Sequence, residues 1–69
     1  MDMIPEIGFA AGEVYFCGID KPVELTLLKK KVGRREDVLN MALGWLAREG
    51  NIELYEEKGR IYVRKINQG

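Results

Sequence analysis

The basic residues in the middle of the chain are the side chains with the clearest capacity to bind an anionic partner. Lys29, Lys30 and Lys31 follow one another, and two arginines come shortly after them. Lysine and arginine contact phosphate oxygens, and asparagine can read adenine in the major groove. The candidate nucleic-acid contacts are therefore Lys29, Lys30, Lys31, Arg34, Arg35, Asn40, Arg48 and Lys58.

Acidic residues near these cations argue against strong DNA binding. Glu36 and Asp37 directly follow Arg34 and Arg35, so the segment 34–37 is neutral. The three consecutive lysines alone would give weak, salt-sensitive binding without sequence preference. Each phosphate contact adds only about one to the slope of log binding constant against log salt concentration. The alternative interpretation is that these cations form an ordinary solvated helix surface.

A second candidate site is apolar. Met41 and Trp45 share one helical stripe with Val38, beside a stripe of leucines on the same helix. Either neighbouring elements bury both stripes, or Met41 and Trp45 are partly exposed and anchor a protein interface, where Trp and Met are enriched. Gly44 would let a partner backbone approach closely. The candidate interface residues are Met41, Gly44, Trp45, Tyr55 and Tyr62.

The residue types of the chain do not indicate a catalytic or metal site. The chain has no histidine and one cysteine, which excludes a Cys/His zinc site, an internal disulfide and a His-based triad. We therefore expect no enzyme activity, no cofactor and no metal. Cys17 is expected to be a small buried hydrophobic residue rather than a redox sensor. Gly8 and Gly12 lack the Lys-Ser/Thr of a phosphate-binding loop and are interpreted as packing glycines.

Length and charge limit the function classes further. A chain of 69 residues allows one domain, taken as residues 1–69 with residues 67–69 frayed. Eleven basic and eleven acidic residues cancel, so no global field attracts nucleic acid or a membrane. The sequence contains neither an 18-residue apolar run nor a signal peptide at its N-terminus. We predict a cytoplasmic protein that does not contact a membrane.

The first predicted helix carries apolar residues on two sides. Pro5 suits its first turn, and Gly18 suits its end. One stripe consists of Ile7, Ala11, Val14 and Tyr15. Phe9 and Phe16 lie on another stripe, so we expect a central helix that is buried on more than one side.

Two further helices follow in a helix-turn-helix pattern. Thr26 is the candidate N-cap of the second helix, which ends at Gly33, and the third helix closes at Gly50. A turn of about three residues joins them, as in other helix-turn-helix motifs. The alternating residues 23–25 predict a very short strand before the second helix.

The last part of the chain predicts a β-hairpin with Lys58-Gly59 as its two-residue loop. The expected cross-strand pairs on one face are Glu57/Arg60, Tyr55/Tyr62 and Glu53/Arg64. The other face, which we expect to pack on the helices, consists of Ile52, Leu54, Ile61 and Val63. A slip of one residue would lose both patterns, so the register is well specified.

The order helix, strand, helix, helix, strand, strand predicts an α+β winged helix-turn-helix fold, with three helices, a C-terminal β-hairpin wing and a short extra strand. The segments IGFAAGEVY and LNMALGWLAREGNI resemble the small prokaryotic winged helix-turn-helix family catalogued as a domain of unknown function. The resemblance covers nearly the whole chain and implies this fold without an activity. The chain differs from the family pattern at one place. Arg34-Arg35 stands before the third predicted helix, where such domains usually have a Ser or Thr cap.

Two functions are compatible with these observations. The first is a DNA-binding or transcription-regulator-like module that needs dimerisation for useful affinity. The second is a protein–protein interaction module on the same scaffold, which uses the Met41/Trp45 surface and does not bind DNA. The partner would accordingly be DNA, another protein or a second copy of the chain. Fold analogy favours the first function, while the neutral charge and the charge-matched wing favour the second.

Overall fold

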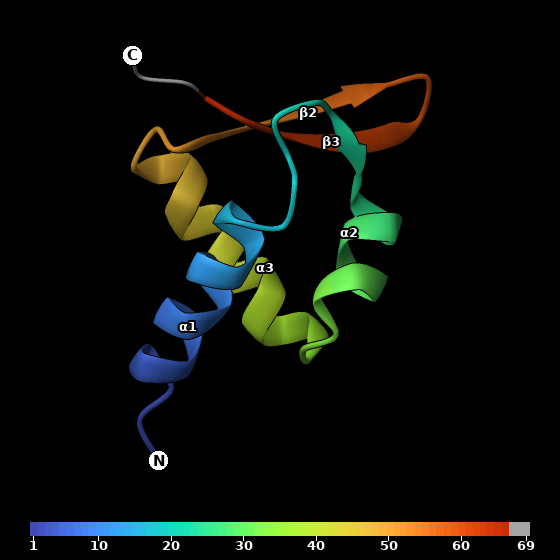
Figure 1. Ribbon diagram of the computed structural model, residues 1–69. Helices are drawn as coiled ribbons and strands as arrows, with labels where there is room; N and C mark the ends of the chain where they lie inside the picture. Colours follow the sequence, from blue (N-terminus) through green and yellow to red (C-terminus); the bar gives the residue numbers. More distant parts are fainter. Residues whose placement is uncertain (67–69) are drawn as a thin grey trace.

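Three helices pack on one side of a three-stranded antiparallel sheet (Figure 1). The computed structural model describes residues 1–66. The helices are α1 (Ile4–Tyr15), α2 (Leu25–Val32) and α3 (Glu36–Arg48), and the strands are β1 (Val23–Glu24), β2 (Ile52–Glu57) and β3 (Arg60–Lys65). This order confirms the predicted α+β winged helix-turn-helix fold. The fraying predicted for residues 67–69 lies outside the described residues.

The sheet has the order β1-β3-β2, with the register expected from the sequence. Tyr55 lies opposite Tyr62 across β2 and β3, and Lys58-Gly59 forms the loop between these strands. Both loop residues have positive φ angles, 51° and 77°, as a type I′ hairpin turn requires. The alternation of side chains and the turn residues therefore agree on a single pairing.

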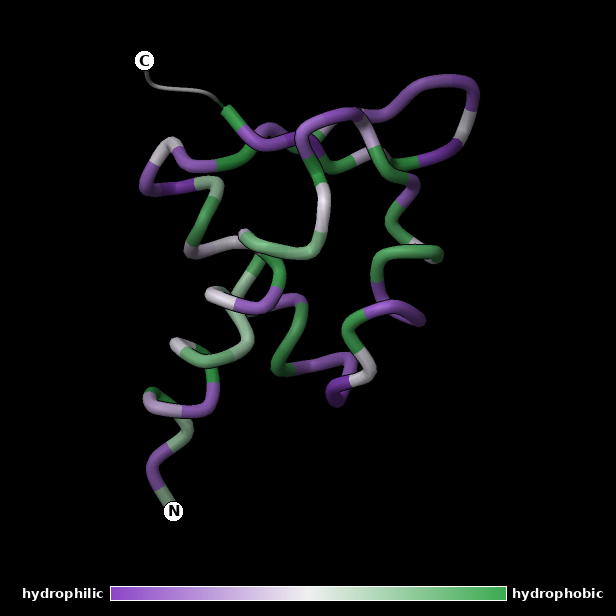
Figure 2. The backbone as a smooth tube through the Cα atoms, in the orientation of Figure 1, coloured by the Kyte–Doolittle hydropathy of each residue, from purple (hydrophilic) through white to green (hydrophobic). Residues whose placement is uncertain are grey.

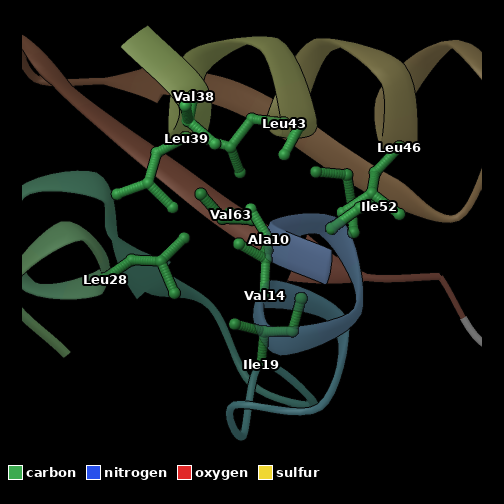
Figure 3. Packing of buried hydrophobic residues seen from close by; sticks show 12 residues of the cluster. Ala10, Val14, Ile19, Leu28, Val38, Leu39, Leu43, Leu46, Ile52 and Val63 are labelled. Carbon is green, nitrogen blue, oxygen red and sulfur yellow. The ribbon is translucent and has the colours of Figure 1, made fainter. Parts of the chain in front are cut away.

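The core lies where α1, α2 and α3 meet the inner face of the sheet. Figure 3 shows Leu28 of α2, Leu39 of α3 and Val63 of β3 directed toward Val14 of α1. All fully buried residues in the described part of the chain are apolar. Figure 2 shows the complementary pattern, with hydrophilic residues at the hairpin tip and in the α2–α3 turn. The core therefore holds the fold together without a buried polar network.

The expectation that α1 is buried on more than one side is wrong. One face of α1 enters the core through Ala10, Ala11 and Val14. Phe9 and Phe16, on the opposite side, are 68% and 78% exposed. Within residues 1–66, α3 and α2 make the main contacts with α1, and they leave Phe9 and Phe16 uncovered.

The start of α2 also differs from the prediction. The N-cap is Glu24, whose carboxylate accepts a hydrogen bond from the Thr26 backbone N–H at 2.8 Å. Thr26 therefore donates to the cap instead of providing it. The predicted end is confirmed, because Gly33 adopts the left-handed conformation at φ 66°. α3 begins at Glu36, and its N-cap residue Arg35 makes no side-chain capping hydrogen bond, as the missing Ser or Thr implies.

The Glu24 cap makes the stability of α2 dependent on pH. Hydrogen bonds from the Thr26 backbone and hydroxyl hold the pKa of Glu24 below its usual value, with smaller contributions from Arg60 and Lys30. Because the folded-state pKa is depressed, the stabilisation is complete above about pH 4.3, the ordinary pKa of Glu, and is lost as the pH falls through the folded pKa. We expect Glu24→Gln to lower the melting temperature at neutral pH and to converge with the wild type in acid. Circular dichroism melts across this range measure the difference, and curves that stay parallel in acid would contradict the role of the carboxylate.

Candidate protein and nucleic-acid interfaces

Three of the candidate nucleic-acid contacts are engaged in ion pairs. The pairs are Lys29–Glu36 at 3.1 Å, Arg34–Glu13, and Arg35–Asp37 at 2.7 Å. The hydrogen bonds between Arg35 and Asp37 raise the pKa of the guanidinium and lower the pKa of the carboxyl. Exposed pairs of this kind contribute only about 0–1 kcal/mol, but they keep the potential at the start of α3 close to neutral. The charge cancellation expected from the sequence at residues 34–37 is therefore partly realised through Arg35 and Asp37.

The other candidate contacts are spread over several elements. Within residues 1–66 no ion pair engages Lys30, Lys31, Arg48 or Lys58, and all four are exposed. They belong to α2, to the end of α3 and to the hairpin tip, respectively. Asn40 is exposed on α3 and lines a hollow that faces the wing. The cations are thus available, but three different elements present them.

The hollow between α3 and the wing is mostly apolar. It has a volume of about 360 Å³. It is lined by Leu25, Asn40, Leu43, Gly44, Leu54, Tyr55, Glu56 and Ile61. A recognition helix and wing would face DNA phosphates in this region, and here they offer mainly apolar side chains, one amide, one tyrosine and one carboxylate, without a cation. The lining is therefore unfavourable for a phosphate backbone.

The inner face of the hairpin is buried only at one end. Ile52 and Val63 enter the core as predicted, whereas Leu54 and Ile61 remain exposed. In the outer half of the hairpin, Leu25 at the start of α2 lines a hollow with Leu54 and Ile61 but does not bury them. The expectation that all four residues pack on the helices is wrong for this half.

The outer face of the sheet carries the tyrosine pair. Tyr55 and Tyr62 stack with their ring centroids 5.7 Å apart. Arg64 pairs with Glu53 at 3.3 Å, as predicted. In the described residues Glu57 and Arg60 are register partners without an ion pair. The tyrosines therefore lie on a charged surface of the sheet.

Met41 and Trp45 are both about half exposed, and Trp45 is 52% exposed. This result decides between the two alternatives left open by the sequence, because α1 and the hairpin do not cover both stripes of α3. Trp45 lines a hollow of about 180 Å³ together with Ile4, Ile7 and Gly8 of α1. Gly44 and Tyr55 instead line the hollow beside the wing. The five candidate interface residues are thus distributed over separate surfaces.

The surface around Trp45 continues onto α1. We define the α1–α3 face as Ile4, Gly8, Gly12, Phe16, Met41 and Trp45. A second hollow of about 430 Å³ joins four of these residues, since it is lined by both glycines, Phe16 and Trp45. Sequence reasoning missed the α1 residues of this face. These residues could have been identified from the sequence, because every fourth position from Ile4 to Phe16 is uncharged.

The six residues of the α1–α3 face are uncharged, although 32% of the chain is charged; the exposed Arg48 and Glu49 border the face three and four positions after Trp45. The two acidic residues of α1 lie on its other flank, where Glu13 pairs with Arg34 and Glu6 helps to raise the pKa of Arg35. At the C-terminal end of the face, the Lys65 ammonium lies 5.4 Å from the ring centroid of Phe16, with its side chain largely covered. An exposed helix surface is normally polar, so this face is unusual for a small domain.

The helical glycines of this region are not required by packing within the chain. A Cβ atom added at Gly8, Gly12 or Gly44 would meet nothing within 4 Å. A glycine inside a helix is about 1 kcal/mol less favourable than alanine. The interpretation of Gly8 and Gly12 as internal packing glycines is therefore wrong, and the fold itself gives no reason for their presence.

Cys17 is half-buried and packs against the core. Burial raises the pKa of its thiol, and the nearby charges of Lys31 and Lys65 only partly oppose this shift. Residues 1–66 contain no cluster of three or more metal-ligating side chains. No helix in that range has the length and apolar character needed to cross a bilayer.

Comparisons with known proteins agree with the architecture. The model of the family described as "Winged helix-turn-helix domain (DUF2582)" matches residues 1–65. The solution NMR structure of protein BT2368 from Bacteroides thetaiotaomicron is similar, with a TM-score of 0.75 and 27% sequence identity. The match covers 94% of this chain and 79% of that chain. A search of curated proteins found no match.

Proposed function

Because the chain belongs to the winged helix-turn-helix domain family DUF2582, we propose that it is a protein-interaction module in which the helix-turn-helix serves as a scaffold. The α1–α3 face is the proposed binding surface. The observation that carries this proposal is the half-exposed Trp45, which lines two hollows together with uncharged residues only. The proposed role is binding rather than catalysis, as expected from the residue types.

The chemistry of the face suits a protein partner. Trp is enriched among the few residues that supply most of the binding free energy in protein interfaces, and Met is enriched in interfaces generally. Contiguous apolar patches are uncommon on monomeric soluble proteins and mark interaction sites. The two hollows beside Trp45 would accept apolar side chains of a partner without removing a charge from water.

A pair of neighbouring substitutions tests this proposal. Met41 and Asn40 are adjacent and exposed, but Met41 shares the stripe of Trp45, whereas Asn40 lines the wing hollow. We expect Met41→Glu to abolish protein association and Asn40→Glu to leave it intact. Self-association and affinity capture with the two purified variants provide the measurement. Equal behaviour of the two variants would contradict the proposed surface.

DNA binding is the second candidate, because winged helix domains often bind DNA and Lys30, Lys31 and Arg48 are exposed without an ion pair in the described residues. The ion-paired arginines and the apolar wing hollow argue for weak contacts to the phosphate backbone. Such binding would show little sequence preference and would fall steeply with salt.

A titration with mixed-sequence duplex DNA tests this second candidate. At low salt we expect at most weak binding, with a salt slope of about 3 or less, because only a few phosphates can be contacted at once. Lys30→Glu with Lys31→Glu should remove this binding, and Met41→Glu should leave it unchanged. Binding tighter than about 1 µM at physiological salt would contradict the charge argument, since non-specific binders reach only about 1–100 µM.

A further inference from the structure

We propose that the α1–α3 face binds a second copy of this chain, with the two α1 helices crossing in antiparallel orientation at Gly8 and Gly12. This inference rests on the proposed function and names its partner. The product is a symmetric dimer in which both copies use the same surface.

The α1 stripe is complementary to itself in shape. Ile4, Gly8, Gly12 and Phe16 follow one another at intervals of four residues, with large side chains at the ends and glycines in the middle. A two-fold axis between the glycines places Gly8 of one copy against Gly12 of the other. It also places Ile4 against Phe16 of the second copy, at both ends of the contact. In such an isologous interface residue i meets j and j meets i, which this arrangement of large and small residues satisfies.

The hollows and the glycines fit this arrangement. Phe16 is 78% exposed, and in the second copy it would lie beside Ile4 and Gly8, which line the 180 Å³ hollow with Trp45. Two helices pack through rows of residues spaced by four, and glycines in those rows let the backbones approach closely. A close partner backbone would account for Gly8 and Gly12, which the packing of a single copy leaves without a role.

The charges also favour a second copy. A nucleic acid or a charged peptide would have to lose water from its charges against a face that offers no opposite charge. Asp2 precedes one end of the stripe, and Lys65 lies at the other end, where it pairs with Asp20 at 3.8 Å. The antiparallel arrangement brings the end of the stripe that follows Asp2 in one copy toward the end of the other copy that carries the Lys65–Asp20 pair. The zero net charge of the chain removes long-range repulsion between copies.

The free edge of β2 is a less suitable surface for self-association. Half of its six residues are acidic, namely Glu53, Glu56 and Glu57. Antiparallel pairing of two such edges would place like charges across from one another, which is destabilising. The α1–α3 face has no such conflict.

Sedimentation of purified variants tests the proposal, with Gly8→Glu as the interface variant and Gly44→Glu as its matched control. Both sites are helical glycines at which a Cβ meets nothing within 4 Å, so we expect both variants to keep the fold, which circular dichroism of each variant checks. We expect the wild type and Gly44→Glu to form dimers. Gly8→Glu should weaken dimerisation roughly 100-fold or more, because two carboxylates would be buried without a counter-charge.

The possible outcomes separate this inference from the proposed function. A wild type that remains monomeric up to about 1 mM, where even weak complexes form, overturns the second-copy assignment. If such a monomer still captures a protein and Gly8→Glu abolishes that capture, the proposed function stands with a different partner. If Gly8→Glu has no effect on dimerisation or capture, both the inference and the proposed surface are wrong.

Isotope-filtered NMR of a mixed labelled and unlabelled dimer tests the antiparallel crossing itself. Ile4 and Phe16 are 12 residues apart, which is about 18 Å along a helix and too far for an NOE within one copy. We expect an NOE between Ile4 and Phe16 across the dimer. Intermolecular NOEs that join Ile4 to Ile4 instead would contradict the antiparallel arrangement.

Discussion

Leu28→Ala destabilises the domain by about 2–5 kcal/mol, whereas Leu27→Ala changes its stability by less than about 0.5 kcal/mol. The two leucines are neighbours in α2, but Leu28 is 1% exposed and Leu27 is 59% exposed. Leu28 enters the core beside Leu39, so its removal leaves a cavity in addition to the lost transfer free energy (Figure 3). Small domains bury little apolar surface, and a loss of this size removes much of their net stability.

Chemical denaturation of both variants measures this difference. The wild type and Leu27→Ala should share a midpoint, and Leu28→Ala should unfold at a much lower denaturant concentration with a similar slope. Equal midpoints for the two leucine variants would mean that α2 is rotated relative to the core. Such a result would also change which sides of Lys29, Lys30 and Lys31 face solvent.

Trp45→Ala weakens the proposed protein association by about 30-fold or more, while the isolated domain loses only about 1–2 kcal/mol of stability. A fully buried tryptophan would cost about 3–5 kcal/mol, but half of this side chain is in water. Leu39→Ala is the matched control, because Leu39 is buried in the same helix and does not line the two hollows beside Trp45. We expect it to destabilise the fold, with little effect on association in the protein that remains folded.

Trp45 also reports directly on the face, because it is the only tryptophan of the chain. In dilute protein its fluorescence should be red-shifted and accessible to acrylamide. At concentrations where copies associate, the emission should shift to the blue and the quenching should decrease. Full protection in a dilute monomer would show that Trp45 belongs to the core and would remove the main support for the proposed function.

The hairpin is the element that the sequence specifies most completely. The side chains of β2 and β3 alternate with a period of two, and Lys58-Gly59 favours one turn type, so a single register satisfies both. The stripe of leucines in α3 predicts its buried face for the same reason, since Leu39, Leu43 and Leu46 are all buried. These features depend on neighbouring residues within one element or one hairpin.

The exposed side of α1 could not be predicted in this way. Its apolar residues form two stripes, and periodicity alone does not show which stripe another element covers. The tertiary structure decides this question, because α3 and α2, which make the main contacts with α1, leave Phe9 and Phe16 exposed. Periodicity also could not show how the candidate interface residues are arranged. Trp45 is exposed on α3, while Tyr55 and Tyr62 lie on the outer face of the sheet.

The sequence by itself determined the elements, their order, the winged helix-turn-helix fold and the charge balance. These follow from local spacing, turn residues and composition, which act over a few positions along the chain. The tertiary structure alone decided that Phe16 and Trp45 lie on one uncharged surface and that Arg34 is neutralised by Glu13 of a different helix. In both cases the residues are more than twenty positions apart in the chain. The packing of α1 against α3 brings Phe16 close to Trp45, and the turn before α3 places Arg34 beside Glu13.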